Sequence, residues 1–215
     1  MEGISYIEKN GTPAIKADGS LYEIPFYKDR YYFMVFENYV NFIKGCENLI
    51  RSMEEYSQYK SSLYAKGLTR CQILGNIDAN FDEDITVEMH HGPIFTLFDY
   101  CGCILTHLVK QNQPKITTFR IASIVMQEHF EGNIQTVMLS KTAHQAVDSN
   151  KVFINLDMAN GDLGGFLDKY SDGLLEDQKV KINKYIDLSK KYNSTDNGLF
   201  KLEEHIKDWS QRRHY

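Results

Sequence analysis

Two histidine-containing segments of the sequence have the residue types and the spacing of a metal site. His90 and His91 end a segment in which apolar and polar residues alternate, and His144 precedes Asp148 by about one helical turn. Residues four positions apart share one face of a helix, so His144 and Asp148 can direct a ring nitrogen and a carboxylate at one ion. His90 can supply a third ligand from a strand. The sequence therefore predicts a divalent metal site made of His90, His144 and Asp148.

The histidine next to the predicted ligand is available for a second task. Adjacent residues of a strand point to opposite sides, so His90 and His91 cannot both bind one ion in regular geometry. Histidine has an unperturbed pKa of about 6.5 and can take a proton from water near neutral pH. A divalent ion opposite it would neutralise charge developing on a phosphate. We therefore expect His91 to be the general base of a phosphodiester hydrolase, with Asn133 holding the ring in its productive tautomer through hydrogen bonds.

The order of these residues resembles that of a known nuclease family. The segments Val87 to His91 and Leu139 to His144, with Asn133 in a Gly-Asn turn between them, are similar to the ββα metal motif of HNH, or His-Me finger, endonucleases. The phage-encoded members are the most similar. The resemblance covers about residues 88 to 152, and it implies cleavage of DNA to products that carry 5′ phosphates.

The resemblance also assigns roles to individual residues. It implies that His90 and His144 bind the metal, that His91 is the general base and that Asn133 is the central asparagine of the motif. Many members have a second helix histidine where this sequence has Asp148. A carboxylate at this position favours Mg²⁺ or Mn²⁺, with Zn²⁺ or Ni²⁺ as alternatives. The cysteine pairs that brace many such motifs with zinc are missing from the sequence.

Two helices are expected between the two strands of this motif. Apolar residues recur with helical spacing over residues 93–110 and 118–130, and strand patterns cover 85–90 and 134–139. Ser140 is a suitable N-cap for the helix that holds His144. The expected fold class is therefore α+β: a ββα-metal (HNH) motif with a helical insertion, flanked by helical N- and C-terminal segments.

The segments before the motif contain few residues of chemical interest. Met1 to Asp29 has the glycines and prolines of a hairpin or extended loop, and Arg30 to Lys66 has the spacing of an amphipathic helix that Gly45 divides in two. Gly67 is expected to cap that helix, and Leu68 to Leu74 to form a short strand. The apolar surface of this helical region favours a homodimer.

Three domains are expected along the chain. They are an N-terminal hairpin and helical region at 1–80, an HNH-like nuclease domain at 81–170 and a lysine-rich helical tail at 171–215. Lysines among tyrosines in the tail could contact phosphates, although a solvated helix face explains them equally well. The candidate nucleic-acid-binding residues are Lys179, Lys181, Lys184, Lys190 and Lys191.

Composition limits the function classes further. The chain has 215 residues and a formal net charge of −5, which excludes a globally basic nucleic-acid binder. Its apolar runs are too short for a membrane span, and its four cysteines lack zinc-finger spacing, so a cytoplasmic protein with reduced core thiols is expected. We expect a metal-dependent DNA endonuclease, with recruitment by a protein partner and no membrane. The alternative is a non-catalytic, metal-binding phage accessory protein that interacts with host proteins.

Overall fold

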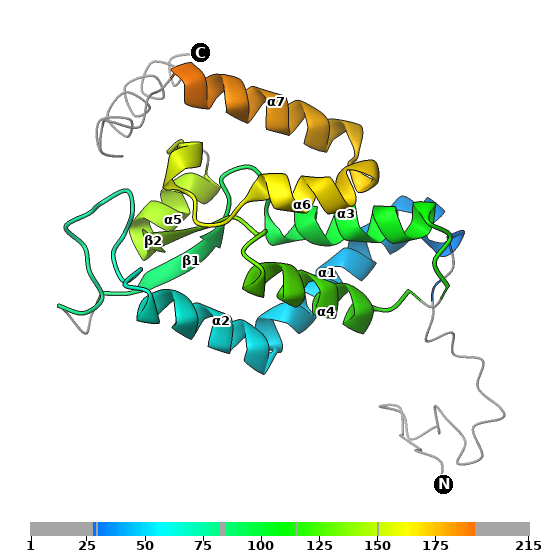
Figure 1. The fold of residues 1–215 in the computed structure, drawn as a ribbon, viewed down its shortest axis with the longest axis horizontal. Helices are drawn as coiled ribbons and strands as arrows, with labels where there is room; N and C mark the ends of the chain where they lie inside the picture. Colours follow the sequence, from blue (N-terminus) through cyan, green and yellow to red (C-terminus); the bar gives the residue numbers. More distant parts are fainter. Residues whose placement is uncertain (1–27, 29, 82–84, 115, 150, 192–215) are drawn as a thin grey trace, which may run out of the picture.

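The computed structural model describes residues 28, 30–81, 85–114, 116–149 and 151–191, and this part of the chain is mainly helical around one two-stranded antiparallel sheet (Figure 1). The segment expected to form an N-terminal hairpin lies almost wholly outside the described residues. The elements in chain order are η1 (Tyr32–Met34), α1 (Phe36–Ser52), α2 (Glu54–Ala65), β1 (Val87–His91), α3 (Leu97–Lys110), α4 (Thr118–Phe130), β2 (Thr136–Ser140), α5 (Lys141–Asp148), η2 (Leu156–Met158), α6 (Leu163–Tyr170), η3 (Ser171–Gly173) and α7 (Glu176–Lys191).

The first helical region is broken at a different residue from the one expected. Met53 has an extended backbone that separates α1 from α2, whereas Gly45 lies inside α1. A Cβ atom on Gly45 would lie 3.6 Å from the Thr118 side chain of α4, an ordinary van der Waals distance, so the packing of these helices does not require a glycine there. Gly67 follows α2 with φ of 85°, the left-handed conformation expected of a glycine cap.

The prediction of a strand at Leu68 to Leu74 is wrong, because this segment makes isolated backbone hydrogen bonds and no continuous ladder with a neighbouring strand. The Cys71 amide donates to the Ile77 carbonyl, which closes a local turn, and the Gln72 amide donates to the Met138 carbonyl of β2. The side chain of Gln72 also accepts a hydrogen bond from the Met138 amide at 2.7 Å. The segment thus covers the edge of β2 without continuing the sheet.

The sheet pairs β1 with β2, with Met89 opposite Met138 and His91 opposite Thr136. The expected alternation is present in β1: Met89 and His91 are buried, and the intervening His90 is only half-buried. All five residues of β2 are buried, because the main core covers one face and a smaller apolar cluster covers the other. That smaller cluster contains Cys71, Ile73, Val137, Leu139, Ala143, Val152 and Ile154.

The helices between the strands, α3 and α4, contribute a large part of the core. Helix α4 spans the residues predicted for it, and α3 begins at a capping box in which Thr96 and Asp99 exchange hydrogen bonds. The cysteines are free and buried, as expected for core thiols. Helix α6 was not predicted from its glycine-rich sequence, yet it places Phe166 in the centre of the core. Among the described helices none is long and apolar enough to cross a membrane.

Candidate metal site

The sheet and the helix that follows it bring the predicted metal ligands together. β1 carries His90, and α5, which starts directly after β2, carries His144 and Asp148. One ligand atom from each residue lies within 4.8 Å of the others. The Asp148 carboxylate is 3.7 Å from Nδ1 of His90 and 3.6 Å from Nε2 of His144. Residues far apart in the sequence thus form one cluster with two nitrogen donors and one oxygen donor.

The order of elements follows from local signals in the sequence. Ser140 is the last residue of β2, and its hydroxyl accepts a hydrogen bond from the Ala143 amide, which starts α5 where the sequence predicted it. Antiparallel pairing then places α5 beside β1 (Figure 1). The order strand, strand, helix is that of a ββα unit, and α3 and α4 are inserted between its strands.

Burial keeps one of the candidate ligands in the form that binds metal. The pKa of His90 is lowered from 6.5 to about 4, first by desolvation and then by the neighbouring His144. A neutral imidazole is the form that coordinates a metal ion. The His90 side chain is 12% exposed and the Asp148 side chain 63%, so the cluster opens to solvent on the carboxylate side.

A second carboxylate orients the helix histidine. Oε2 of Glu88 lies 2.7 Å from Nδ1 of His144, and this contact leaves Nε2 of His144 facing Asp148. Carboxylates commonly hold the second nitrogen of a metal-binding histidine in this way. Glu88 shares a strand face with His90, as the period-two pattern of this strand predicts, and its carboxylate contacts His144 from that face.

His91, the predicted general base, is not part of this cluster. Its side chain lies on the other face of β1, where it is 5% exposed and stacks on Tyr56. Nε2 of His91 is 2.9 Å from Nε2 of His129, and Nδ1 of His129 is 2.8 Å from the Val125 carbonyl. Because a carbonyl only accepts, His129 donates from Nδ1, and His91 therefore donates to His129. The structure gives no support to the prediction that His91 faces a substrate.

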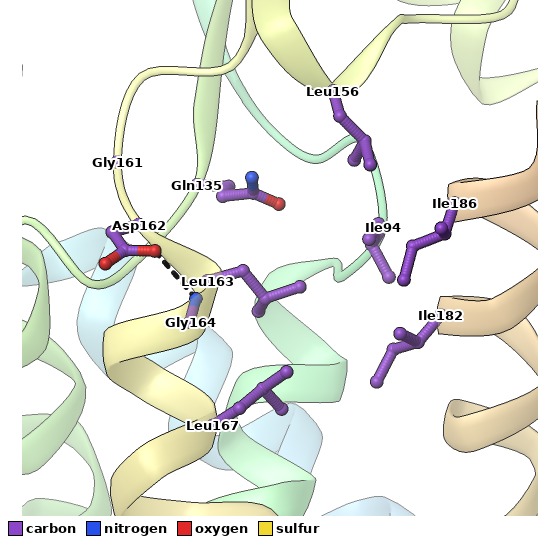
Figure 2. A pocket seen from close by; sticks show the side chains of 10 residues that line it. All are labelled: Ile94, Gln135, Leu156, Gly161, Asp162, Leu163, Gly164, Leu167, Ile182 and Ile186. Carbon is purple, nitrogen blue, oxygen red and sulfur yellow. Dashed lines mark hydrogen bonds between the residues drawn. The ribbon is translucent and has the colours of Figure 1, made fainter. Parts of the chain in front are cut away.

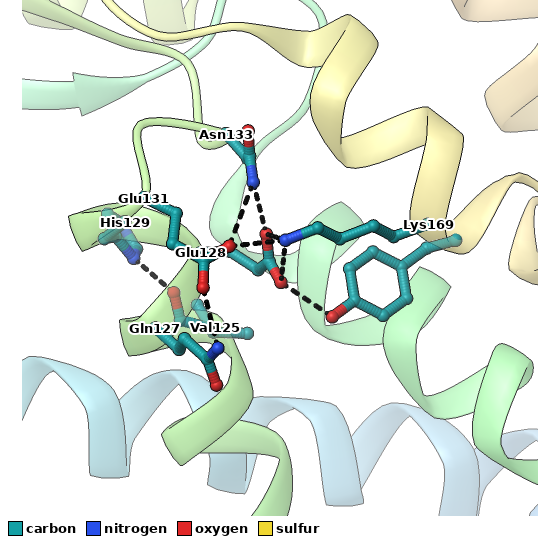
Figure 3. A network of polar contacts seen from close by, with 8 residues as sticks. Val125, Gln127, Glu128, His129, Glu131, Asn133 and Lys169 are labelled. Atoms are coloured by element: carbon teal, nitrogen blue, oxygen red, sulfur yellow. Dashed lines mark hydrogen bonds and ion pairs between the residues drawn. The ribbon is translucent and has the colours of Figure 1, made fainter.

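Asn133 also lies away from the cluster, in a polar network between α4 and α6 (Figure 3). Its Nδ2 donates to the buried Glu128 carboxylate at 2.7 Å, and the Tyr170 hydroxyl donates to the same carboxylate at 2.8 Å. Lys169 forms ion pairs with both Glu128 and Glu131. The Asn133 amide therefore bonds back to the end of α4, while Lys169 and Tyr170 tie α6 to the same carboxylate. Neither side-chain hydrogen bond of Asn133 in the described part of the chain goes to the predicted general base.

Replacing Lys169 with Met should lower the free energy of unfolding by about 1–3 kcal/mol, because the Glu128 carboxylate would stay buried with neutral donors alone. Urea denaturation measures this change. The matched control is Lys179→Met on α7, whose ion pair with the exposed Glu176 is screened by solvent and should contribute little to stability. Equal losses in the two variants would show that the network in Figure 3 does not stabilise the fold.

Of the lysine-rich helical tail predicted at 171–215, residues 176–191 form α7 and residues 192–215 lie outside the described part of the chain. The charges of α7 are partly neutralised. Lys179 pairs with Glu176 at 2.6 Å, and Lys181 pairs with Asp99 of α3 at 2.8 Å. Lys184 and Lys190 are exposed, and Lys191 ends α7. The proposed contact of these lysines with nucleic acid stays a prediction.

The described fold and cluster define a mainly helical protein with a small sheet and a surface group of two histidines and a carboxylate suited to a divalent ion. Residues 8–211 match the family described as Bacteriophage G278-like virion protein, and the chain belongs to that family. Comparisons with curated proteins and with solved structures gave no match. The family confirms the phage part of the resemblance stated above, and the nuclease part stays a prediction.

Proposed function

We propose that this virion protein binds one divalent metal ion through His90, His144 and Asp148 and hydrolyses phosphodiester bonds of DNA at that site. The observation that carries the proposal is the convergence of these three side chains within 4.8 Å from two separate elements of a ββα arrangement. When bound, such an ion would lower the pKa of water and withdraw charge from a phosphate oxygen.

The residues of the chain would have distinct roles in this reaction. His90 and His144 would hold the ion as neutral imidazoles, and Asp148 would complete the set from the solvent side. Glu88 would act as a positioning residue, since its carboxylate fixes the ring of His144. Mn²⁺ accepts both kinds of donor in this set, whereas the carboxylate favours Mg²⁺ and the two imidazoles favour Zn²⁺.

The position of His91 favours a second candidate function, that of a non-catalytic metal-binding virion protein. A histidine paired with His129 in the core does not take a proton from a water molecule at the cluster. Activation of water would then depend on the ion alone. In the second candidate function the ion stabilises the contact of α5 with β1 and performs no reaction.

Substituting a ligand should abolish tight metal binding. We expect His144→Ala to weaken binding of Mn²⁺ or Zn²⁺ by more than about 100-fold, because it removes a ligand. Glu88→Gln should weaken binding by about 10- to 100-fold, the usual effect of substituting a residue that hydrogen-bonds to a ligand. Isothermal titration calorimetry measures both. The control is His107→Ala, which removes a histidine that contacts Asp172 in a different part of the fold.

A plasmid cleavage assay with the same proteins distinguishes the two candidate functions. Each protein is incubated with supercoiled plasmid and each metal in turn. Nicking by wild type and His107→Ala, but not by His144→Ala, supports the nuclease. Metal binding without cleavage supports the non-catalytic function. Calorimetric curves that are the same for wild type and His144→Ala would refute the metal site itself.

A further inference from the structure

The ring of His90 lies against Gly92, the first residue after β1. A Cβ atom at position 92 would lie 2.8 Å from Nε2 of His90 and 2.9 Å from its Cδ2. Non-bonded heavy atoms approach favourably only to about 3.5 Å, so both distances are too short for contact. The histidine ring therefore occupies the space that a side chain at position 92 would need.

The backbone at position 92 does not itself require a glycine. The described glycines with a positive φ are Gly67, Gly132 and Gly161, and Gly92 is not among them. Apart from its two chain neighbours, the only described atoms within 4 Å of a Cβ at position 92 belong to the His90 ring. An alanine there would thus suit the backbone and conflict with that ring alone.

The backbone around position 92 is held in place, so a conflict would move the ring and not the chain. The Gly92 amide donates to the Gln135 carbonyl at 3.3 Å, and the Gln135 amide donates to the hydroxyl of the buried Tyr100 at 3.0 Å. Two residues further on, Ile94 is 2% exposed, and its side chain lies beside Ile182 of α7 (Figure 2). Rotation of the histidine side chain is the smaller adjustment.

The orientation of the ring decides whether His90 can serve as a ligand. Nδ1 of His90 faces the Asp148 carboxylate at 3.7 Å, and the ring packs edge to face on His144 with centroids 4.9 Å apart. Nε2, on the opposite side of the ring, is the nitrogen that faces position 92. Because the ring is rigid, a rotation that moves Nε2 away from position 92 also moves Nδ1 out of the cluster.

We propose that Gly92 is a positioning residue of the metal site, because its missing side chain leaves the space in which the His90 ring presents Nδ1 to the ion. This inference rests on the metal binding proposed above. It extends the set of residues that control the site to one that has no donor atom of its own.

A double-mutant cycle on the full chain tests the role of Gly92. Gly92→Ala should weaken binding of Mn²⁺ or Zn²⁺ about 10- to 100-fold in calorimetry, the usual effect of disturbing the support of a ligand. In a His90→Ala background the added methyl group meets no ring, so it should change the already weakened affinity by no more than about twofold. The matched control is Gly75→Ala, whose Cβ meets no described atom within 4 Å, and it should bind metal as wild type does.

Urea denaturation of the same proteins in EDTA gives a readout that does not depend on metal. Gly92→Ala should lower the midpoint more in the presence of the His90 ring than in the His90→Ala background. Equal shifts in the two backgrounds, a loss of folding in both included, would overturn the proposal, since the methyl group would then act on something other than the ring.

The calorimetric outcomes separate this proposal from the one on which it rests. If Gly92→Ala binds metal as tightly as wild type, the role of Gly92 is refuted and the metal site stands. If wild type binds neither ion, the metal site is refuted and the role of Gly92 with it.

Discussion

Replacing Phe166 with Ala should lower the free energy of unfolding by about 3–5 kcal/mol, the usual cost of removing a fully buried aromatic ring. Phe166 has no exposed surface. Its ring centroid lies 4.9 Å from that of Tyr100 and 4.8 Å from that of Tyr170, and Phe95 packs on it edge to face. The substitution leaves a cavity where α3 and α6 meet, and urea denaturation measures the loss.

The control for this substitution is Phe119→Ala on α4. The Phe119 side chain is 68% exposed, so its removal should change stability by no more than about 0.5 kcal/mol. A loss in Phe166→Ala as small as that in the control would mean that α6 does not pack on the core in solution.

The elements that were predicted correctly depend on signals within a few residues. Helix α4 has the predicted bounds because its apolar spacing is regular and Thr117 caps it. Ser140 starts α5, and Gly67 adopts a positive φ, because capping depends on side-chain and backbone chemistry at a single position. β1 has the predicted alternation because one face of the strand is covered by the core.

The elements that were missed depend on distant parts of the chain. Asp162 caps α6, but the glycines after it indicate a loop unless Phe166 is known to have Tyr100 as a neighbour. Residues 68–74 have strand-like composition, yet β2 offers them only isolated hydrogen bonds through Gln72. Tertiary packing overrides local preference in both cases.

At the candidate metal site, too, the contacts of a residue depend on parts of the chain that are distant in sequence. His90 and His91 look equivalent in sequence, but the strand directs His90 toward α5 and His91 toward α4. The alternation places His91 on the same face as Val87 and Met89, which is the core face of the strand. The ligand set could be predicted from spacing, whereas the partner of His91 could not, because His129 comes from α4, far away in the sequence.

The free energy of unfolding should fall by about 3 kcal/mol between pH 6.5 and pH 4 through His129 alone. Desolvation lowers the pKa of His129 from 6.5 to about 4, since the side chain is 1% exposed. The unfolded chain takes up a proton near pH 6.5 that the folded chain does not accept until about pH 4. Between these values the unfolded state binds more protons, and stability therefore decreases as pH falls.

The substitution His129→Gln separates this effect from other titrations. Glutamine can still hydrogen-bond to His91 but does not titrate, so the slope of stability against pH should decrease by about 1.4 kcal/mol per pH unit near pH 5. Burial also lowers the pKa of His91 and of His90, and these groups leave a residual slope of the same sign. Ser123→Ala, on the exposed face of the same helix, should keep the wild-type slope. If His129→Gln keeps it too, His129 is accessible to protons in the folded protein, and the buried histidine pair does not exist in solution.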